Sequence, residues 1–398
     1  MAGSEVYTYN LCKELAKSNN IWVFTRIEDS FLPHYEVDND IFDGMRVIRV
    51  NKPSRDYTVR SKYIDKHMER IFEKHLQKIQ PDIAHIGHLS HLSTTIVNVI
   101  KDHGLPIVFT LHDYWMLCIR GQLIRNDSSL CEGVNTENCA RCLAPYFHSN
   151  ENAIQEIKKL QKHLADIRNL VDMYIAPSQF LRNIYIKMGM PGEKILHSNY
   201  GFDITVFEGL RKKPSNNIRF GFLGRIIPVK GIDLLIDAFN DINTEDAELN
   251  IYGELLPSTK YLKRRIKNSH VNFRGSYNNW DIADVLSDID VLFVPSIWYE
   301  NSPLVIQEAF LAKIPVIASD LGGIPELVHH GNNGLLFRPR DVDDLRSKME
   351  TFINDPDLIK RLSPDPTQVR TIQDDAASIM SIYKQLLNSK SSRSTYAT

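Results

Sequence analysis

The segment Asp290-Val-Leu-Phe-Val-Pro-Ser-Ile-Trp-Tyr-Glu-Asn-Ser-Pro-Leu-Val-Ile-Gln-Glu-Ala309 contains a predicted strand, a loop and the start of a helix. Its first part is a short apolar run typical of a buried strand, and Pro303 marks the predicted helix start. A helix start directs backbone amides and its positive end toward the space above the strand, where an anion is favoured. Glu300 precedes this helix, and Glu308 lies about one and a half turns inside it at roughly 3.6 residues per turn. Two carboxylates beside an anion site fit a phosphate flanked by polyols, as in a nucleotide-sugar.

Similar apolar runs recur along the chain and alternate with amphipathic helical patterns. They lie at residues 21–25, 106–111, 173–177, 218–223, 248–252, 291–294 and 315–318. Apolar strands that alternate with helices indicate parallel sheets covered by helices on both faces. The predicted fold class is therefore α/β, doubly wound.

The composition is that of a large globular protein. A chain of 398 residues with 43% hydrophobic and 24% charged residues predicts two domains. Its formal charge of -2 provides no net basic field that would attract nucleic acid. No apolar run approaches the roughly 20 residues of a membrane span, and the start of the chain lacks the apolar core of a signal peptide. We therefore expect a cytoplasmic protein.

The pattern of strands and helices also predicts the domain boundaries. We expect an N-terminal domain over residues 1–205, a C-terminal domain over 206–370, a helix over 371–388 that crosses back to the first domain, and a disordered tail over 389–398. The polar segment 212–217 resembles a linker. A helical pattern begins directly after Gly3, so either the chain begins late or the first domain lacks its first strand. A missing strand would leave a gap in the middle of the sheet.

A glycine-containing segment from Gly221 to Gly231 follows an apolar strand and precedes a helical pattern. Within it, Arg225 and Lys230 could hold two phosphates, the first as a planar fork and the second as a point charge. The alternative is an ordinary strand-to-helix turn with solvated cations, because short glycine motifs are common by chance. The phosphate interpretation gains support from the pair of carboxylates predicted in the same domain.

Taken together, these motifs resemble the retaining glycosyltransferases of family 4, also called glycosyl transferases group 1, over nearly the whole chain. The resemblance rests on Gly3-Ser-Glu-Val-Tyr7, His112-Asp113, Ala176-Pro-Ser178, Gly224-Arg225, Lys230-Gly231, Tyr252-Gly-Glu254, Phe273-Arg-Gly275, Pro295-Ser296, the segment from Glu300 to Glu308, and Gly322-Gly-Ile-Pro-Glu326. That family has the GT-B fold, in which two doubly wound Rossmann-like domains face each other across a cleft. The resemblance implies transfer of a sugar from a nucleoside diphosphate donor to an acceptor hydroxyl of a glycan, polysaccharide, glycolipid or small molecule.

The resemblance also implies roles for individual residues. Arg225 and Lys230 would bind the donor diphosphate, Glu308 the ribose hydroxyls and Glu300 the transferred sugar, with Arg274 beside the base. His112, in the first domain, would face the sugar and the acceptor. The catalytic residues are then His112, Arg225, Lys230 and Glu300, and the donor-binding residues are Gly3, Gly224, Arg225, Lys230, Arg274, Glu300, Asn301, Ser302, Leu304 and Glu308.

No catalytic metal is expected. A leaving diphosphate gains negative charge, and fixed cations together with a helix terminus can stabilise it. By the resemblance, the diphosphate itself helps to deprotonate the acceptor hydroxyl. Two alternatives stay open, a nucleotide-sugar epimerase of the same fold and a non-catalytic sugar-nucleotide binder, the latter suggested by the short segment before Gly3.

Four cysteines, Cys118, Cys131, Cys139 and Cys142, lie close together in the sequence, the last two as Cys-x2-Cys. Four thiolates could form a tetrahedral structural zinc site that orders a long loop. The other spacings, with twelve and seven intervening residues, fit no standard zinc finger. Unlinked reduced thiols, and a redox or iron-sulfur role, are therefore alternatives to zinc.

Residues 46–79 carry a local excess of positive charge, ten Lys or Arg against four Asp or Glu, along an apolar helical stripe. Such a segment can contact the inner face of an anionic membrane that holds a lipid-linked acceptor. It can equally be a core-facing helix with a solvated basic side.

Asp288-Ile-Asp290 matches the Asp-x-Asp pattern of metal-dependent sugar transferases. Acidic residues are ordinary at a junction between a helix and a strand, so we do not expect a metal there.

Overall fold

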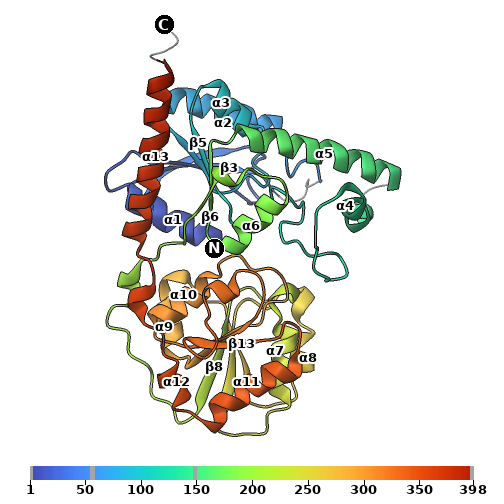
Figure 1. Ribbon diagram of the computed structural model, residues 1–398, viewed down its shortest axis with the longest axis vertical. Helices are drawn as coiled ribbons and strands as arrows, with labels where there is room; N and C mark the ends of the chain where they lie inside the picture. Colours follow the sequence, from blue (N-terminus) through green and yellow to red (C-terminus); the bar gives the residue numbers. More distant parts are fainter. Residues whose placement is uncertain (1–2, 54–58, 147–149, 395–398) are drawn as a thin grey trace. The chain divides into compact units, whose positions relative to one another are not determined.

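The computed structural model describes residues 3–53, 59–146 and 150–394, and the chain divides into two compact units. The N-terminal unit contains residues 7–199 and the residues from 372 onward. The C-terminal unit contains residues 200–371 and the residues up to 6. Both units are α/β with parallel sheets, which confirms the predicted fold class (Figure 1).

The C-terminal unit is built on one six-stranded sheet with the order β10-β9-β8-β11-β12-β13, and all neighbouring strands are parallel. Its strands are β8 (Ile218–Leu223), β9 (Ala247–Tyr252), β10 (Val271–Gly275), β11 (Val291–Val294), β12 (Val316–Ser319) and β13 (Gly334–Phe337). The central strands β8 and β11 are buried along their whole length, because helices cover both faces. Their bounds are those predicted from the apolar runs.

Six helices accompany this sheet. They are α7 (Ile232–Asn240), α8 (Leu262–Arg265), α9 (Ile282–Ser287), α10 (Leu304–Leu311), α11 (Val342–Asn354) and α12 (Leu358–Arg361). Helix α7 packs against α8 and α11 (Figure 1). The core between helices and sheet is aromatic-rich and includes Phe220, Phe239, Phe293, Phe337 and Phe352.

The N-terminal unit contains two separate sheets. The first has the order β1-β3-β2 and the second the order β4-β5-β6-β7. The strands are β1 (Trp22–Ile27), β2 (Val37–Phe42), β3 (Met45–Asn51), β4 (Ala84–Ile86), β5 (Ile107–Thr110), β6 (Met173–Ala176) and β7 (Ile195–His197). All pairs are parallel except β2 with β3. In the described part of the chain, no strand precedes the first helix.

The helices associated with this unit are α1 (Gly3–Leu15), whose first residues group with the other unit, α2 (Lys66–Ile79), α3 (Ile96–Asp102), α4 (Thr136–Leu143), α5 (Asn150–Leu170), α6 (Gln179–Lys187) and α13 (Ile372–Ser394). The last helix packs beside the first, and the hydroxyl of Tyr7 donates a hydrogen bond of 2.9 Å to the buried carboxylate of Asp375. Helix α13 runs to Ser394 instead of ending at Asn388, since no glycine or proline interrupts it. Residues 395–398 of the expected tail lie outside the described residues.

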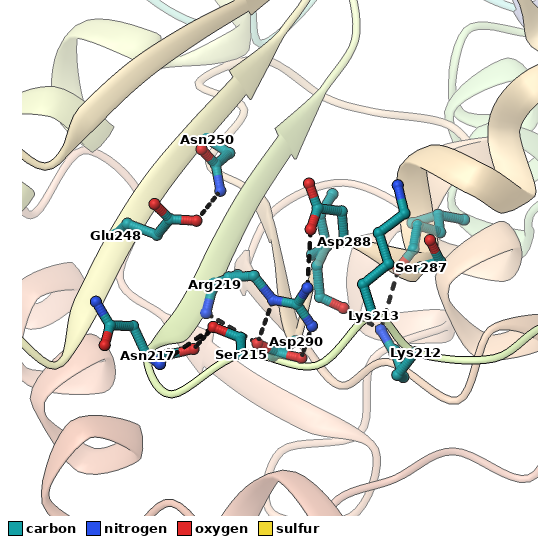
Figure 2. A network of polar contacts seen from close by, with 12 residues as sticks. Lys212, Lys213, Ser215, Asn217, Arg219, Glu248, Asn250, Ser287, Asp288 and Asp290 are labelled. Atoms are coloured by element: carbon teal, nitrogen blue, oxygen red, sulfur yellow. Dashed lines mark hydrogen bonds and ion pairs between the residues drawn. The ribbon is translucent and has the colours of Figure 1, made fainter.

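The polar segment 212–217 is a surface loop of the C-terminal unit, and the expectation of a linker there is wrong. The Lys212 ammonium donates to the Leu286 carbonyl at 3.0 Å, and the Lys213 amide donates to the Ser287 carbonyl at 3.0 Å (Figure 2). The Asn217 side chain donates to the Glu245 carbonyl at 2.9 Å. Polar composition predicted solvent exposure correctly, but the backbone of this loop is fixed to its own unit.

Within residues 3–53, 59–146 and 150–394, no helix is both long enough and apolar enough to cross a membrane.

Candidate active site

The candidate site lies where the order of strands in the C-terminal sheet reverses direction. Strands β8 and β11 are neighbours, and the chain proceeds outward from them on opposite sides. In open parallel sheets, ligands bind at the carboxyl ends of the strands at this switch point. Two loops leave the sheet there, residues 224–231 after β8 and residues 295–303 after β11.

An ion pair joins these two loops. The ammonium of Lys230, from the loop after β8, lies 2.6 Å from Oε1 of Glu300, from the loop after β11. Glu300 is only 5% exposed, whereas Lys230 is half-buried and also lies over the ring of Trp298, 5.8 Å from its centroid. The structure therefore brings together two of the residues predicted for catalysis.

Three donors converge on one oxygen of Glu300. The Ser296 hydroxyl donates to Oε1 at 2.7 Å and the Trp298 indole N–H donates to Oε1 at 2.9 Å, in addition to Lys230. No described residue donates a hydrogen bond to Oε2 of Glu300. This arrangement fixes the Glu300 carboxylate through Oε1. Oε2 can then accept a hydrogen bond from a hydroxyl group of a ligand.

The loop after β8 and the segment after β12 each approach the loop after β11 so closely that one position in each requires glycine. Gly231 has φ of +71°, and a Cβ there would lie 2.0 Å from the carbonyl oxygen of Pro295. Gly322 has φ of +68°, and a Cβ there would lie 2.5 Å from the carbonyl oxygen of Glu300. The amide of Gly323 donates to that same carbonyl at 2.8 Å. Glycine tolerates both the positive φ and the contact, so the backbone around Glu300 is held from two sides.

Glu308 lies on α10 inside the first turns after the loop, and burial raises its pKa to about 7. No hydrogen bond to its carboxylate is found among the described residues. Burial also raises the pKa of Tyr277, and the nearby Glu308 charge adds to that effect. A carboxyl group that lacks partners in the protein is suited to accept a hydrogen bond from a ligand.

The remaining predicted donor residues lie on several elements of this unit, and the structure does not bring Arg274 to the Lys230–Glu300 pair, because its side chain contacts Asn250 and Glu248 of β9. Arg225 is exposed on the loop after β8, next to Gly224 with φ of +143°. Arg274 donates to the Asn250 side chain at 2.8 Å. Asn301 is buried and Ser302 half-buried in the loop after β11, and Leu304 begins α10. Gly3 groups with this unit, where an added Cβ would lie 3.4 Å from Leu304.

Sequence reasoning did not identify Trp298 and Tyr277. Trp298 hydrogen-bonds Glu300 and Tyr277 lies near Glu308. A tryptophan two residues before a candidate sugar-binding carboxylate is a usable signal, since its N–H donates when buried. Tyr277 follows β10, far from Glu308 in sequence, and only the fold relates the two.

His112 lies in the N-terminal unit, directly after β5. Its ring makes an edge contact with Tyr7, 5.7 Å between ring centroids. Burial lowers the pKa of His112 to about 3, with a further contribution from His88, so the ring is neutral at pH 7. A neutral imidazole can exchange hydrogen bonds with sugar hydroxyls, but it carries no charge for phosphate.

The four clustered cysteines line one small cavity in the N-terminal unit. The Cys131 thiol donates to the Gly133 carbonyl at 3.2 Å, and burial raises the pKa of Cys139 to about 12. Among the described residues, no group of three or more His, Cys, Asp or Glu side chains could hold a metal ion. The four thiols line this one cavity without forming such a group, and a zinc site built from Cys118, Cys131, Cys139 and Cys142 stays a prediction.

Asp288 and Asp290 form a structural network with Arg219 rather than a metal site (Figure 2). Arg219 is 4% exposed on β8, and its guanidinium donates to Asp288 at 2.8 Å and to Asp290 at 2.9 Å. Both carboxylates lie at the amino end of β11, the opposite end of the strand from Glu300. The network joins β8 to β11 below the site.

Comparison with known families identifies the class of protein that this fold and site define. A family model described as Glycosyltransferase Family 4 matches residues 1–205, and one described as Glycosyl transferases group 1 matches residues 207–366. The chain belongs to glycosyltransferase family 4, as the sequence motifs predicted.

Two curated relatives illustrate the sequence similarity. An uncharacterized glycosyltransferase of Methanocaldococcus jannaschii is 33% identical over 40% of this chain and 46% of its own length. The MMP α-(1→4)-mannosyltransferase of Mycolicibacterium hassiacum is 25% identical over 58% of this chain and 57% of its own length. The matched part thus spans about half the length of these curated relatives.

Solved structures share the fold. The sucrose-phosphate synthase of Thermosynechococcus elongatus matches with a TM-score of 0.77 at 19% identity, over 98% of this chain and 94% of that one. The Anabaena protein HepE, solved in complex with UDP and glucose, matches with a TM-score of 0.64 at 20% identity, over 98% and 96% of the two chains.

Proposed function

We propose that this protein is a retaining glycosyltransferase that moves a sugar from a nucleoside diphosphate sugar to an acceptor hydroxyl. In this reaction the bond between the anomeric carbon and the diphosphate breaks, and a bond from that carbon to the acceptor oxygen forms on the same face. The acceptor proton passes to the leaving diphosphate. The catalytic centre would be the switch-point site of the C-terminal unit.

The observation that supports this proposal best is the Lys230–Glu300 pair at the carboxyl ends of β8 and β11. A cation and a carboxylate held next to each other suit a ligand that has an anionic group beside hydroxyl groups. We propose that the donor diphosphate replaces Glu300 as the ion-pair partner of the Lys230 ammonium. Oε2 of Glu300 would then accept a hydrogen bond from a sugar hydroxyl. Glu308 is half-buried, and no described residue hydrogen-bonds its carboxylate, which would accept hydrogen bonds from the ribose hydroxyls.

Fixed positive charge would stabilise the leaving diphosphate. Arg225 is exposed and Lys230 half-buried on the same loop, and the amides that precede α10 add the positive end of a helix. We propose that these groups provide the charge that a divalent cation provides in other sugar transferases. Turnover that is unchanged by EDTA would agree with this role.

We propose a UDP-sugar as the donor, because the related HepE structure contains UDP and glucose. The acceptor would be a hydroxyl of a growing glycan, polysaccharide or glycolipid. The M. hassiacum relative, by its name, transfers mannose. The identity of the transferred hexose is therefore tested separately from the identity of the nucleotide base.

The test is a nucleotide-release assay. The purified chain is incubated with UDP-glucose, UDP-galactose, UDP-N-acetylglucosamine or GDP-mannose, with and without a mixture of oligosaccharide acceptors. Release of the nucleoside diphosphate that requires an acceptor, together with a new glycoside by mass spectrometry, would establish the transferase. Conversion of the donor to its epimer without an acceptor would instead establish an epimerase, and donor binding without turnover would leave a binding protein.

We further propose a peripheral contact between α2 and an anionic membrane surface at which a lipid-linked acceptor is held. Lys66, Arg70, Lys74 and Lys78 recur every four residues along α2, and all four side chains are exposed. Such a row forms one basic stripe, while Met68 and Leu76 face the core. Residues 54–58 of the basic segment lie outside the described residues.

Vesicle sedimentation tests this contact. Binding to vesicles with 30% phosphatidylserine, lost at high salt and in a Lys66→Glu/Lys74→Glu variant, would support it. Sedimentation of equal amounts of protein with neutral and anionic vesicles would contradict the membrane contact. That result would not affect the nucleotide-release assay, which tests the transferase function separately.

A further inference from the structure

The ion pair between Lys230 and Glu300 joins two side chains of unequal exposure. Nζ of Lys230 lies 2.6 Å from Oε1 of Glu300, and the exposed fractions of the two side chains are 27% and 6%. In the described part of the chain, the Lys230 ammonium forms an ion pair with no other carboxylate. An anion that binds this ammonium therefore has to displace Glu300 from it.

The position of Glu300 is fixed by neutral groups as well. The Ser296 hydroxyl and the Trp298 indole N–H donate to its Oε1 at 2.7 Å and 2.9 Å. Its backbone carbonyl accepts a hydrogen bond of 2.8 Å from the amide of Gly323. Lys230, by contrast, carries its charge at the end of a flexible four-carbon stem. An exchange of partners therefore moves the ammonium and leaves the carboxylate in place.

The loops around the pair are also joined by backbone contacts. The amide of Ile297 donates to the carbonyl of Val229 at 2.9 Å, which connects the loop after β11 to the loop after β8. The guanidinium of Arg340, after β13, donates to the carbonyl of Ile297 at 3.2 Å. These hydrogen bonds do not involve the ion pair. Its loss is therefore a local change at two side chains, without separation of the loops.

A nucleotide-sugar and a nucleoside diphosphate differ in what they offer to Glu300. Both attract the Lys230 ammonium through phosphate, and both leave a buried carboxylate without its charged partner, which is costly. A hydroxyl of the bound sugar can donate to Oε2 of Glu300 and offset part of that cost. A nucleoside diphosphate has no sugar hydroxyl at this position. Glu300 therefore opposes the binding of the diphosphate more than the binding of the donor.

We infer that Glu300 competes with the bound diphosphate for Lys230, and that this competition makes the site discriminate between the sugar donor and the nucleoside diphosphate product. When the transferred sugar leaves Oε2, the ion pair forms again and favours release of the product. The inference rests on the proposed transferase function. It gives Glu300 a role in product release, in addition to its contact with the sugar.

The experiment measures the Kd for UDP and for UDP-glucose by calorimetric titration of the full chain. Glu300→Gln keeps an acceptor for Ser296 and Trp298 but removes the charge that pairs with Lys230. We expect its Kd for UDP to fall about tenfold, the effect of removing one charged competitor. The Kd for UDP-glucose should fall less or rise, because the amide accepts the sugar hydroxyl more weakly than a carboxylate does. Glu300→Ala should also bind UDP more tightly than the parent protein.

Two controls separate competition from a general effect of charge. Asp320 directly follows β12 at the same edge of the sheet, and its exposed carboxylate forms no ion pair among the described residues. Asp320→Asn should leave the Kd for UDP unchanged. In a Lys230→Gln background, Glu300→Gln should no longer tighten UDP binding, because the group for which Glu300 competes is absent.

Several results would overturn the inference. Unchanged or weaker UDP binding by folded Glu300→Gln and Glu300→Ala would do so even if the transferase assay is positive. Equal tightening by Asp320→Asn, or tightening that persists in the Lys230→Gln background, would assign the effect to long-range charge repulsion instead. If neither UDP nor GDP binds the parent protein or any variant, the proposed donor site itself fails, and the inference fails with it.

Discussion

Lys230 and Glu300 form an ion pair that connects the loops after β8 and β11, with 2.6 Å between Nζ and Oε1. The residues are distant in sequence, and the pair exists only because β8 and β11 are neighbours at the point where strand order reverses. On the proposed function, donor binding would exchange the carboxylate partner of Lys230 for phosphate. Because Ser296 and Trp298 also hold Glu300, its position does not depend on Lys230 alone.

The first prediction concerns Glu300 itself. Glu300→Gln keeps the side-chain size and removes the negative charge, so turnover should fall by about 10²–10³-fold, the usual effect of losing one group that stabilises the transition state. The melting temperature should change little. The kcat for nucleoside diphosphate release measures this loss of turnover. Glu350→Gln, at an exposed position, is the control. A variant that retains most of its turnover would remove Glu300 from the site.

Arg225 should act on donor affinity. Its exposed side chain supports no other part of the unit, so Arg225→Ala should leave the melting temperature unchanged. Loss of a charge-assisted hydrogen bond costs about 2 kcal/mol, and we expect the Kd for UDP to rise roughly 30-fold. Calorimetric titration measures the Kd for UDP of Arg225→Ala and of the control Lys360→Ala. Lys360 is an exposed cation of α12 in the same unit. Equal affinity in both variants would contradict the assignment.

Stability should depend on pH through Glu308, whose folded-state pKa is raised to about 7 by burial. The unfolded chain loses this proton near pH 4.5, so the native state binds more protons in between. The free energy of unfolding attributable to Glu308 therefore falls as pH rises from about 4.5 to about 7. In Glu308→Gln that decline should be absent, a difference of about 1–3 kcal/mol at pH 8. Urea denaturation at pH 5 and pH 8 measures it, and parallel pH profiles for the two proteins would disprove it.

Donor affinity should have the opposite pH dependence at the same residue. The ionised carboxylate accepts hydrogen bonds from ribose hydroxyls more strongly than the neutral acid, so affinity for UDP-glucose should increase from pH 6 to pH 8. UDP-glucose has no phosphate group that titrates in this range. In Glu308→Gln the affinity should be weaker and independent of pH.

Arg219 should contribute to stability without affecting the chemistry. Arg219→Ala leaves Asp288 and Asp290 without their buried partner, and breaking a buried pair costs about 3–5 kcal/mol. Denaturant unfolding should show this loss, and the triple variant with Asp288→Asn and Asp290→Asn should recover part of it. If Arg219→Ala unfolds at the same denaturant concentration as the parent, the network has no stabilising role.

The cysteine cluster allows a direct chemical test. On the zinc hypothesis, elemental analysis of protein purified without chelators finds about one zinc per chain, and Cys139→Ser and Cys142→Ser both abolish it. The five cysteines form no disulfide, so titration of the unfolded, non-reduced protein should detect five thiols, and metal is released with them only if zinc is bound. A folded protein that contains no zinc rejects the hypothesis.

Sequence reasoning located strands with continuous apolar runs well, because such runs allow few alternatives, but it missed β3, which is largely buried although Arg46 and Arg49 interrupt its apolar residues, and β13. The bounds of β8 and β11 were predicted to the residue, and with them the loops that hold Lys230 and Glu300. Strand β2 was missed because its sequence, Val37-Asp-Asn-Asp-Ile-Phe42, belongs to an exposed edge strand with few apolar residues. Periodicity detects burial, and this strand is hardly buried.

Contacts between distant segments could not be predicted in this way. Nothing in the sequence indicates that Tyr277 approaches Glu308 or that Asp288 and Asp290 share Arg219. Each contact depends on the order of strands, which is a property of the folded sheet. The residue types at the site indicated roles for individual side chains only when they were combined with the resemblance to a known family.

If the protein is the proposed transferase, the two glycines at positions 231 and 322 limit how its donor preference can change. Any larger residue there collides with main-chain atoms of the neighbouring loop, so such substitutions would damage folding before they altered the choice of sugar. The backbone conformation around Glu300 therefore cannot change through single substitutions at these two glycines. On the proposed function, new donor preferences would arise from exchanges of side chains on these loops, such as the half-buried Ser302, while the backbone that carries them stays the same.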